Sequence, residues 1–228
     1  MNIYPQLRTC NWYFSGLLTL LIVSSFLLLV YGKSTSFIYL NSYHPFLLNV
    51  FFINYTFIGD GIFAVCVIAL FLFYFKKKQS GIALLSSFLI SGLTAQVMKN
   101  LFNSPRPRLF FEAGQYLYFI DGVTLSNNAS FPSGHTATAF AIATVLALMI
   151  KNKNQQLLIL TAAALVGYSR IYLAQHFLLD VMIGAVIGST SGILSLYLAV
   201  KMKDIADFRR RPANTVNVLL PSSAGSSI

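Results

Sequence analysis

Long apolar runs, separated by short segments that hold most of the charge, constrain the fold of this chain more than any other feature. At a rise of about 1.5 Å per residue, a helix of about 19 residues crosses roughly 30 Å of bilayer hydrocarbon. Charged residues make up 10% of the chain, against about 25% in a soluble domain. The sequence therefore predicts an all-α, integral-membrane helical bundle with six spans. The runs that would form them are residues 13–31, 58–75, 81–99, 132–150, 157–172 and 177–200.

Two apolar stretches need separate treatment. The run 157–172, with 16 residues, is short, so it can span only if its polar end opens into a water-lined cleft. The stretch 37–57 is rich in aromatic residues but is interrupted by asparagine, histidine and proline. That composition favours an additional interfacial helix on the outer face over a seventh span, which would invert the topology of everything after it.

The chain is predicted to form one integral-membrane domain over residues 1–211, with its core at about 58–200. The first run is too long for the core of a signal peptide and is not followed by an A-x-A-like cleavage site, so we expect it to be retained as an anchor. The tail, residues 212–228, is small and polar and is expected to be disordered.

Small residues in the apolar runs are expected to serve packing. Gly184, Gly188 and Gly192 recur at every fourth position of the last run, which predicts close contact with a neighbouring helix. Cys10 and Cys66 lack the spacing of a metal motif and lie beside or within apolar runs, so we expect neither a disulfide nor a metal site from them.

Lysine and arginine residues set the expected orientation. With six spans, eleven of them lie on one side of the membrane and five on the other. The positive-inside rule places the side with eleven, and with it both termini, in the cytoplasm.

The net charge of +10 falls in short clusters between apolar runs, a distribution that does not fit a nucleic-acid groove. We expect no nucleic-acid partner and no obligate protein partner.

Three permanent cations are predicted to meet in one small region of the outer side: Lys99, Arg106 and Arg170. Ionisable groups in a membrane bundle are costly and mark functional sites by default. The carboxylate expected nearby is that of Asp180, with Glu112 or Asp121 of the outer loop as further candidates. A phosphate, which carries close to two negative charges and several acceptor oxygens, suits such a cluster.

The residues Pro132, Ser133, Gly134 and His135 are predicted to open a helix on the same side. Proline suits the first helical position, and glycine lets the backbone approach a ligand closely. Free N–H groups at the helix start would bind phosphate oxygens. An ordinary capped helix start explains the proline and the serine but gives His135 no purpose.

His176 and Asp180 are four residues apart, so on one helix they would share a face and could form a hydrogen bond. A carboxylate on one imidazole nitrogen fixes the tautomer and leaves the other nitrogen free to attack. Arg170 lies about 240° earlier around a continuous helix, so we expect a break between Arg170 and His176. The same His176–Asp180 pair could instead bind a metal or be a buried structural pair. The nearby cations oppose a metal, and a structural pair leaves those cations unexplained.

Together these residues resemble the three-part signature of the type 2 phosphatidic acid phosphatase superfamily. Its members are lipid phosphate phosphatases, and the vanadium-dependent haloperoxidases are soluble relatives. The matching motifs are K-x6-R-P from Lys99 to Pro107, P-S-G-H from Pro132 to His135, and S-R-x5-H-x3-D from Ser169 to Asp180.

The resemblance implies a phosphatase that needs no metal or other cofactor. His176 would be the nucleophile that forms a phosphohistidine, and Asp180 would orient it. His135 would protonate the leaving oxygen and later activate water. Arg108 lies outside the signature and is a candidate contact for the substrate headgroup. The residues that would hold the phosphoryl oxygens are Lys99, Arg106, Ser133, Gly134 through its amide, and Arg170.

The expected function is hydrolysis of a lipid phosphate or pyrophosphate at the periplasmic face of a bacterial inner membrane. Undecaprenyl pyrophosphate and a phospholipid phosphate are the favoured substrates, and a lipid A phosphate is the alternative within the family. The signature does not distinguish water from an alcohol as the acceptor.

Two competing functions use the same cations. A phosphate or anion transporter would be expected to bind its ligand near the bilayer midplane between repeated halves, whereas this chain has no visible repeat and its cluster is at one face. Haloperoxidase chemistry is disfavoured by the membrane spans.

Overall fold

A computed structural model of the chain describes residues 9–111, 119–120, 123 and 128–209, and over that part the chain is helical with no strand. The predicted all-α class is therefore confirmed. The tail 212–228, predicted to be disordered, lies outside the described residues. The elements are α2 (Asn11–Leu40), α3 (Phe46–Tyr55), the 3-10 helix η1 (Thr56–Gly59), α4 (Gly61–Ala69), the π-helical turn η2 (Leu70–Tyr74), α5 (Lys78–Phe102), α6 (Pro107–Phe110), α7 (Gly134–Leu148), α8 (Lys153–Tyr172) and α9 (Leu178–Arg209).

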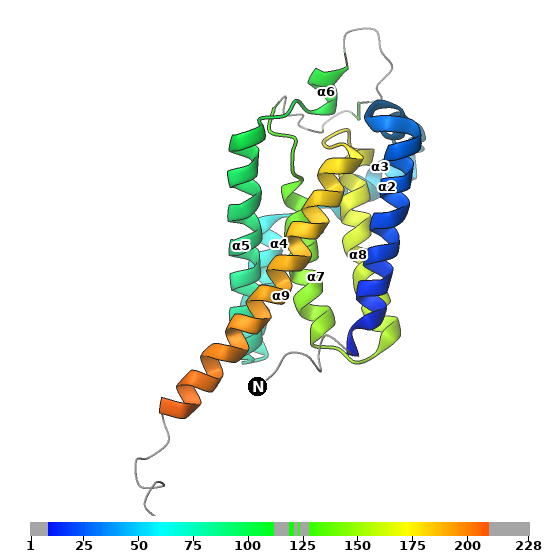
Figure 1. The fold of residues 1–228 in the computed structure, drawn as a ribbon. Coiled ribbons are helices and arrows are strands. Elements are labelled where there is room, and N and C mark those ends of the chain that lie inside the picture. The colour runs from blue at the N-terminus through cyan, green and yellow to red at the C-terminus, as the bar shows by residue number, and fades with distance from the viewer. Residues whose placement is uncertain (1–8, 112–118, 121–122, 124–127, 210–228) are drawn as a thin grey trace, which may run out of the picture.

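The long helices run alternately between two ends of the molecule (Figure 1). Helices α2, α5 and α8 run toward the end that carries α6, and α7 and α9 run back from it. Helix α7 lies at the centre, packed against α5, α8 and α9. This arrangement brings the end of α5, the start of α7, the end of α8 and the start of α9 to one end of the bundle.

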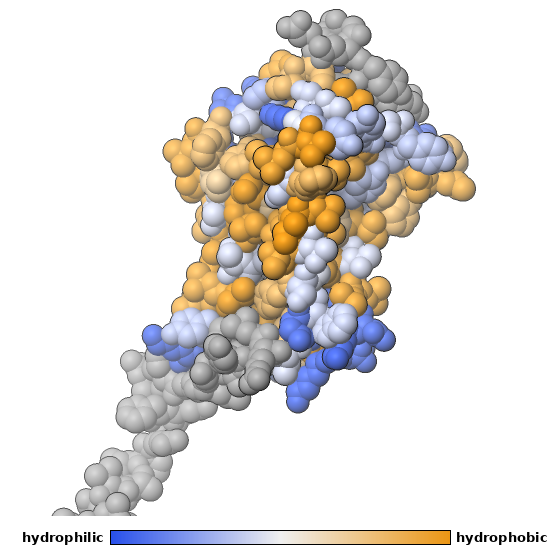
Figure 2. All heavy atoms as spheres, turned by 45° about the vertical axis from the view of Figure 1, so that its right-hand side comes forward, coloured by the Kyte–Doolittle hydropathy of each residue, from blue (hydrophilic) through white to orange (hydrophobic). Residues whose placement is uncertain are grey.

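The surface and the helix lengths identify an integral membrane protein. By length and composition, three segments could each cross a membrane: α2, Lys78–Phe110 and Leu178–Met202. The bent pair Phe46–Gly59 and Gly61–Tyr74, which meet at 56°, would make a fourth. Figure 2 shows apolar side chains around the middle of the molecule and hydrophilic ones toward both ends. The six predicted spans and the interfacial helix go beyond these findings and remain predictions.

The chain breaks twice around the stretch 37–57, first at Gly32 within α2 and then between Leu40 and Phe46. Gly32 has φ 71° and ψ 178°, a conformation that residues with a Cβ rarely adopt. The helix resumes beyond it and ends at Leu40, and Pro45 then caps the separate helix α3. Phe37, in the resumed part, packs against Phe177 with ring centroids 5.3 Å apart.

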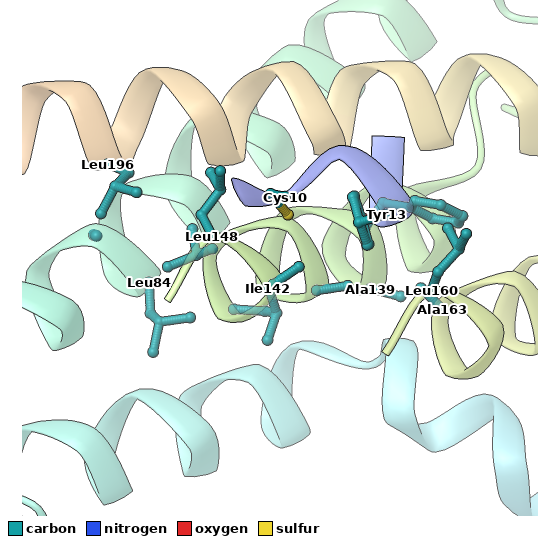
Figure 3. Close-up of a cluster of buried hydrophobic side chains, with 14 of the residues drawn as sticks. Cys10, Tyr13, Leu84, Ala139, Ile142, Leu148, Leu160, Ala163 and Leu196 are labelled. Atoms are coloured by element: carbon teal, nitrogen blue, oxygen red, sulfur yellow. The ribbon is translucent and has the colours of Figure 1, made fainter. Parts of the chain in front are cut away.

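The core is built around α7, of whose 15 residues all but three are buried. Alanine occupies every second position from Ala137 to Ala143, which allows neighbouring helices to approach closely. Side chains from α2, α5, α7, α8 and α9 meet in one cluster (Figure 3). Within it, the buried Tyr13 hydroxyl forms a 2.9 Å hydrogen bond with Thr144 Oγ1, which joins α2 to α7.

The predicted glycine ridge of α9 is confirmed as a packing surface. A Cβ built on Gly184 would lie 2.6 Å from the carbonyl oxygen of Ser133, and one on Gly192 would lie 2.8 Å from Thr144 Cβ. Both neighbours belong to α7 or its N-cap, so the ridge sets the spacing between α7 and α9. The ridge starts beside the first turn of α7, where the site residues lie.

Candidate active site

The predicted break between Arg170 and His176 is present. Helix α8 ends at Tyr172 and α9 begins at Leu178, and the Arg170 carbonyl oxygen accepts hydrogen bonds from the amides of Gln175 (2.9 Å) and His176 (3.1 Å). These two bonds fold the connection back on itself. The corner therefore holds His176, whose residue is 1% exposed, directly beside the end of α8.

The His176–Asp180 pair is present, but its geometry differs from the predicted one. His176 precedes α9 instead of lying on it, and its Nδ1 is 3.7 Å from Asp180 Oδ2. That distance is too long for a hydrogen bond. Asp180 Oδ2 instead accepts hydrogen bonds from the Phe177 amide (2.9 Å) and from Ser130 Oγ, so the buried Nδ1 has no hydrogen-bond partner among the described residues.

The surroundings of His176 keep its imidazole neutral. Burial, reinforced by the charges of Arg170 and Arg106, holds the pKa of His176 well below its usual value, and Asp180 offsets this only in part. A neutral imidazole has a free lone pair at neutral pH. His176 is therefore in the protonation state that a nucleophile requires.

The start of α7 forms a second wall of the site. Ser133 is the N-cap, and its Oγ accepts from the Thr136 amide (3.4 Å) and hydroxyl (2.8 Å). Pro132 thus lies before the helix, and the prediction that it occupies the first helical position was wrong. The Ser133 amide donates to the carbonyl oxygen of Asp180 (3.0 Å), which fastens α7 to α9.

The next amides of α7 are available to a ligand. Among the described residues, no hydrogen-bond acceptor pairs with the backbone N–H of Gly134 or His135, and such groups at a helix start bind anions. Lys99, in the last turn of α5, directs its ammonium group here, 3.6 Å from where a Gly134 Cβ would be. A lysine and a helix N-terminus therefore converge on one point.

The two arginines are held by neutral oxygens. Arg170 is 8% exposed, and its Nη1 donates to Thr56 Oγ1 (2.7 Å). Arg106 Nη1 donates to Gln175 Oε1 (2.7 Å), and its Nε donates to the Asn128 carbonyl oxygen (3.0 Å). Lys99 is repelled by both arginines and attracted by Asp180, so the predicted cluster of three cations is present.

Asp60 is the site residue that the sequence analysis missed. Its Oδ2 lies 3.8 Å from His135 Nε2. A lone acidic residue in an apolar run is by default a functional candidate, and that signal could have identified it. The candidates considered instead, Glu112 and Asp121, lie outside the described residues.

Within the described residues, neither Arg108 nor a set of metal-ligating side chains joins these groups. Arg108, the candidate headgroup contact, is exposed on α6, and no contact joins it to the site within the part of the chain that the structure describes. No group of three or more His, Cys, Asp or Glu side chains suited to a metal ion occurs among the described residues. The polar groups that do converge are three cations and two amides unpaired within the described chain, beside a neutral imidazole, an arrangement that suits an anion.

The fold and this site define a class of protein, namely a helical membrane protein with a buried histidine beside a cluster of cations at one end of the bundle. Residues 80–204, more than half of the chain, match the PAP2 superfamily. The chain belongs to that superfamily.

Relatives with named activities share part of the sequence. The undecaprenyl-diphosphatase of Sulfolobus acidocaldarius is 32% identical over 132 residues, covering 58% of this chain and 61% of that protein. The lipid A 4'-phosphatase of Porphyromonas gingivalis is 29% identical over 169 residues, covering 70% of each chain. The chain thus spans less than two thirds of the Sulfolobus relative.

Two solved structures share the fold. The crystal structure of Aquifex aeolicus LpxE has a TM-score of 0.63 and 34% identity, and the similarity covers 72% of this chain and 94% of that one. The PAP2-type phosphatidylglycerolphosphate phosphatase of Bacillus subtilis has a TM-score of 0.58 and 23% identity, and the similarity covers 86% of this chain and 98% of that one. The second likeness is evidence of the fold alone.

Proposed function

We propose that this protein is an integral-membrane phosphatase that hydrolyses a lipid phosphate or diphosphate through a phosphohistidine at His176. The observation that carries the proposal is the buried, neutral His176 held at a corner beside Arg170, with Arg106 and Lys99 close by. Membership of the PAP2 superfamily and relatives named as lipid phosphatases support it.

In the first step, His176 Nε2 attacks phosphorus and the bond from phosphorus to the leaving oxygen breaks. His135 gives its proton to that oxygen. In the second step, His135 takes a proton from water, the water oxygen attacks phosphorus, and the bond from phosphorus to Nε2 breaks. Asp180 lies on the Nδ1 side of His176, so it would stabilise the positive charge that develops on the ring.

The phosphoryl oxygens would be held by cations and backbone amides. Lys99, Arg106 and Arg170 would surround them, and the N–H groups at the start of α7 would bind from another side. Ser133 would contribute its hydroxyl proton, because its oxygen accepts from Thr136 and leaves that proton available. Arg108 would meet the headgroup from α6.

The finer topology is also a proposal. The proposed topology has six helical passes and an additional interfacial helix on the outer face, which α3 would supply. Both termini would lie in the cytoplasm and the site would face the periplasm of a bacterial inner membrane, which fits the distribution of lysine and arginine. On this topology a lipid in the outer leaflet presents its phosphate directly to the site. We include residues 1–211 in the phosphatase domain.

The substrate class can be tested with the purified protein in detergent. The panel is undecaprenyl diphosphate, phosphatidylglycerophosphate, phosphatidic acid and a lipid A phosphate, read out as phosphate release and ranked by kcat/KM. We expect release from at least one of them and none from the His176→Ala variant. No release from any lipid, together with phosphate flux in proteoliposomes, would instead identify an anion transporter.

A further inference from the structure

The carboxylate of Asp60 faces the imidazole of His135. Asp60 is the N-cap of α4, and its Oδ1 accepts a hydrogen bond from the Ile62 amide (2.8 Å). Its other oxygen, Oδ2, lies 3.8 Å from His135 Nε2, with the two side chains 34% and 32% exposed respectively. The capping bond therefore fixes the carboxylate while leaving one oxygen directed at the imidazole.

The backbone around Asp60 is built against His135. A Cβ on the preceding residue, Gly59, would lie 2.8 Å from the His135 carbonyl oxygen and 3.0 Å from its Cβ. Thr56, at the start of the same short helix η1, accepts the hydrogen bond from Arg170. Contacts at both ends of η1 thus hold Asp60 in place beside His135.

The charges around His135 explain why an acidic side chain is needed next to it. His135 must carry a proton to release a leaving oxygen, yet Lys99, Arg106 and Arg170 all repel a protonated imidazole there. Asp180 is engaged by Phe177 and Ser130. Among the described residues, Asp60 is the acidic side chain in ion-pair range of His135.

We propose that Asp60 is a positioning residue that orients His135 and stabilises its protonated form for proton transfer to the leaving oxygen. The inference rests on the proposed phosphatase function and deepens it. The active site then contains two His–Asp pairs with different tasks: Asp180 serves the nucleophile, and Asp60 serves the acid. A helix cap alone would use Oδ1 only and would not need a carboxylate.

The test compares leaving groups. Asp60→Asn keeps the side-chain shape and the cap acceptor but removes the charge. We expect kcat/KM for the best alkyl lipid phosphate to fall about 10- to 100-fold, a part of what a general acid contributes. For 4-nitrophenyl phosphate, whose leaving group needs no proton, we expect a loss of less than about threefold by the same principle.

Three controls keep the test decisive. Asp60→Glu should restore part of the activity on the lipid phosphate. In a His135→Ala background, adding Asp60→Asn should lower kcat/KM little further, because the two residues act together. Thermal unfolding in detergent should confirm that each variant folds. Equal losses on both substrates, no loss on either, or losses that multiply with His135→Ala would overturn the assignment. If the wild-type protein hydrolyses neither substrate, the proposed function fails, which is a different outcome from failure of the role of Asp60.

Discussion

Arg170 shows at the scale of one residue why the site is built for an anion. Its guanidinium is buried, its Nη1 is held by the Thr56 hydroxyl, and its Nε has no hydrogen-bond partner in the described part of the chain. A buried charge without a bonded counter-ion is costly. Bound phosphate would satisfy the remaining donors, so binding energy would be directed at the reacting group.

Removing the hydroxyl that holds Arg170 should weaken catalysis without removing any charge. In Thr56→Val the side-chain shape is kept, but Arg170 Nη1 loses its acceptor. We expect kcat/KM to fall about tenfold, since one unsatisfied buried donor costs about 1–3 kcal/mol. The matched control is Thr19→Val, because the Thr19 hydroxyl donates to the Ser15 carbonyl oxygen of its own helix and to no other described residue. Equal activity in the two variants would contradict this role.

The residues that could be predicted are those joined by local spacing. The break between Arg170 and His176 followed from an angle on a helix, and the structure has it. Asp60 could not be connected to His135 in this way, because the two are far apart in sequence and meet only where η1 packs on the start of α7. The predicted His176–Asp180 hydrogen bond is absent because His176 lies before α9 and because the Phe177 amide and the distant Ser130 hydroxyl bond the carboxylate instead.

At the scale of elements, the apolar runs predicted where helices lie better than where they break. The last run and α9 both begin near Leu178, but α2 continues past the expected end at residue 31 after a kink at Gly32. The run 58–75 is divided by Asp60 into η1 and α4 and ends in a π-helical turn. Hydropathy does not register such breaks, because they depend on φ and on side-chain caps.

The contact between α7 and α9 should be sensitive to a single methyl group. In Gly188→Ala the new Cβ would meet the Ala137 carbonyl oxygen and lie 2.8 Å from the Ala141 amide nitrogen. We expect a destabilisation of about 1–3 kcal/mol, seen as a lower midpoint of thermal unfolding in detergent. Gly92→Ala, on α5, is the control because no atom of the described residues outside its own helix lies within 4 Å of its Cβ position. A midpoint for Gly188→Ala at or above that of the control would contradict this packing.

At the scale of the whole molecule, the candidate site residues lie at the ends of α5 and α8 and at the starts of α7 and α9. These helix ends meet at one end of the bundle (Figure 1). The opposite end carries the start of α5 with Lys78 and the start of α8 with Lys153. On the face that Figure 2 shows, apolar side chains occupy the middle between the two ends. This polarity gives a direct way to test the proposed orientation.

Single cysteines should report which end faces outward. In a background with Cys10→Ala and Cys66→Ala, the exposed positions Arg108 and Lys151 can each be replaced by cysteine. In right-side-out vesicles, a membrane-impermeant maleimide should label Arg108→Cys at once and Lys151→Cys only after permeabilisation. The reverse pattern would place the site in the cytoplasm and refute the proposed topology.

The central claim, that phosphate passes through His176, is tested most directly by trapping the intermediate. The protein is mixed with a lipid substrate labelled with ³²P at the transferred phosphate, quenched in alkali within one turnover, and mapped by mass spectrometry. We predict an acid-labile phosphoryl group on His176, absent from a folded His176→Ala variant that also releases no phosphate. Phosphate release at the wild-type rate by that variant, or label on another residue, would contradict the mechanism.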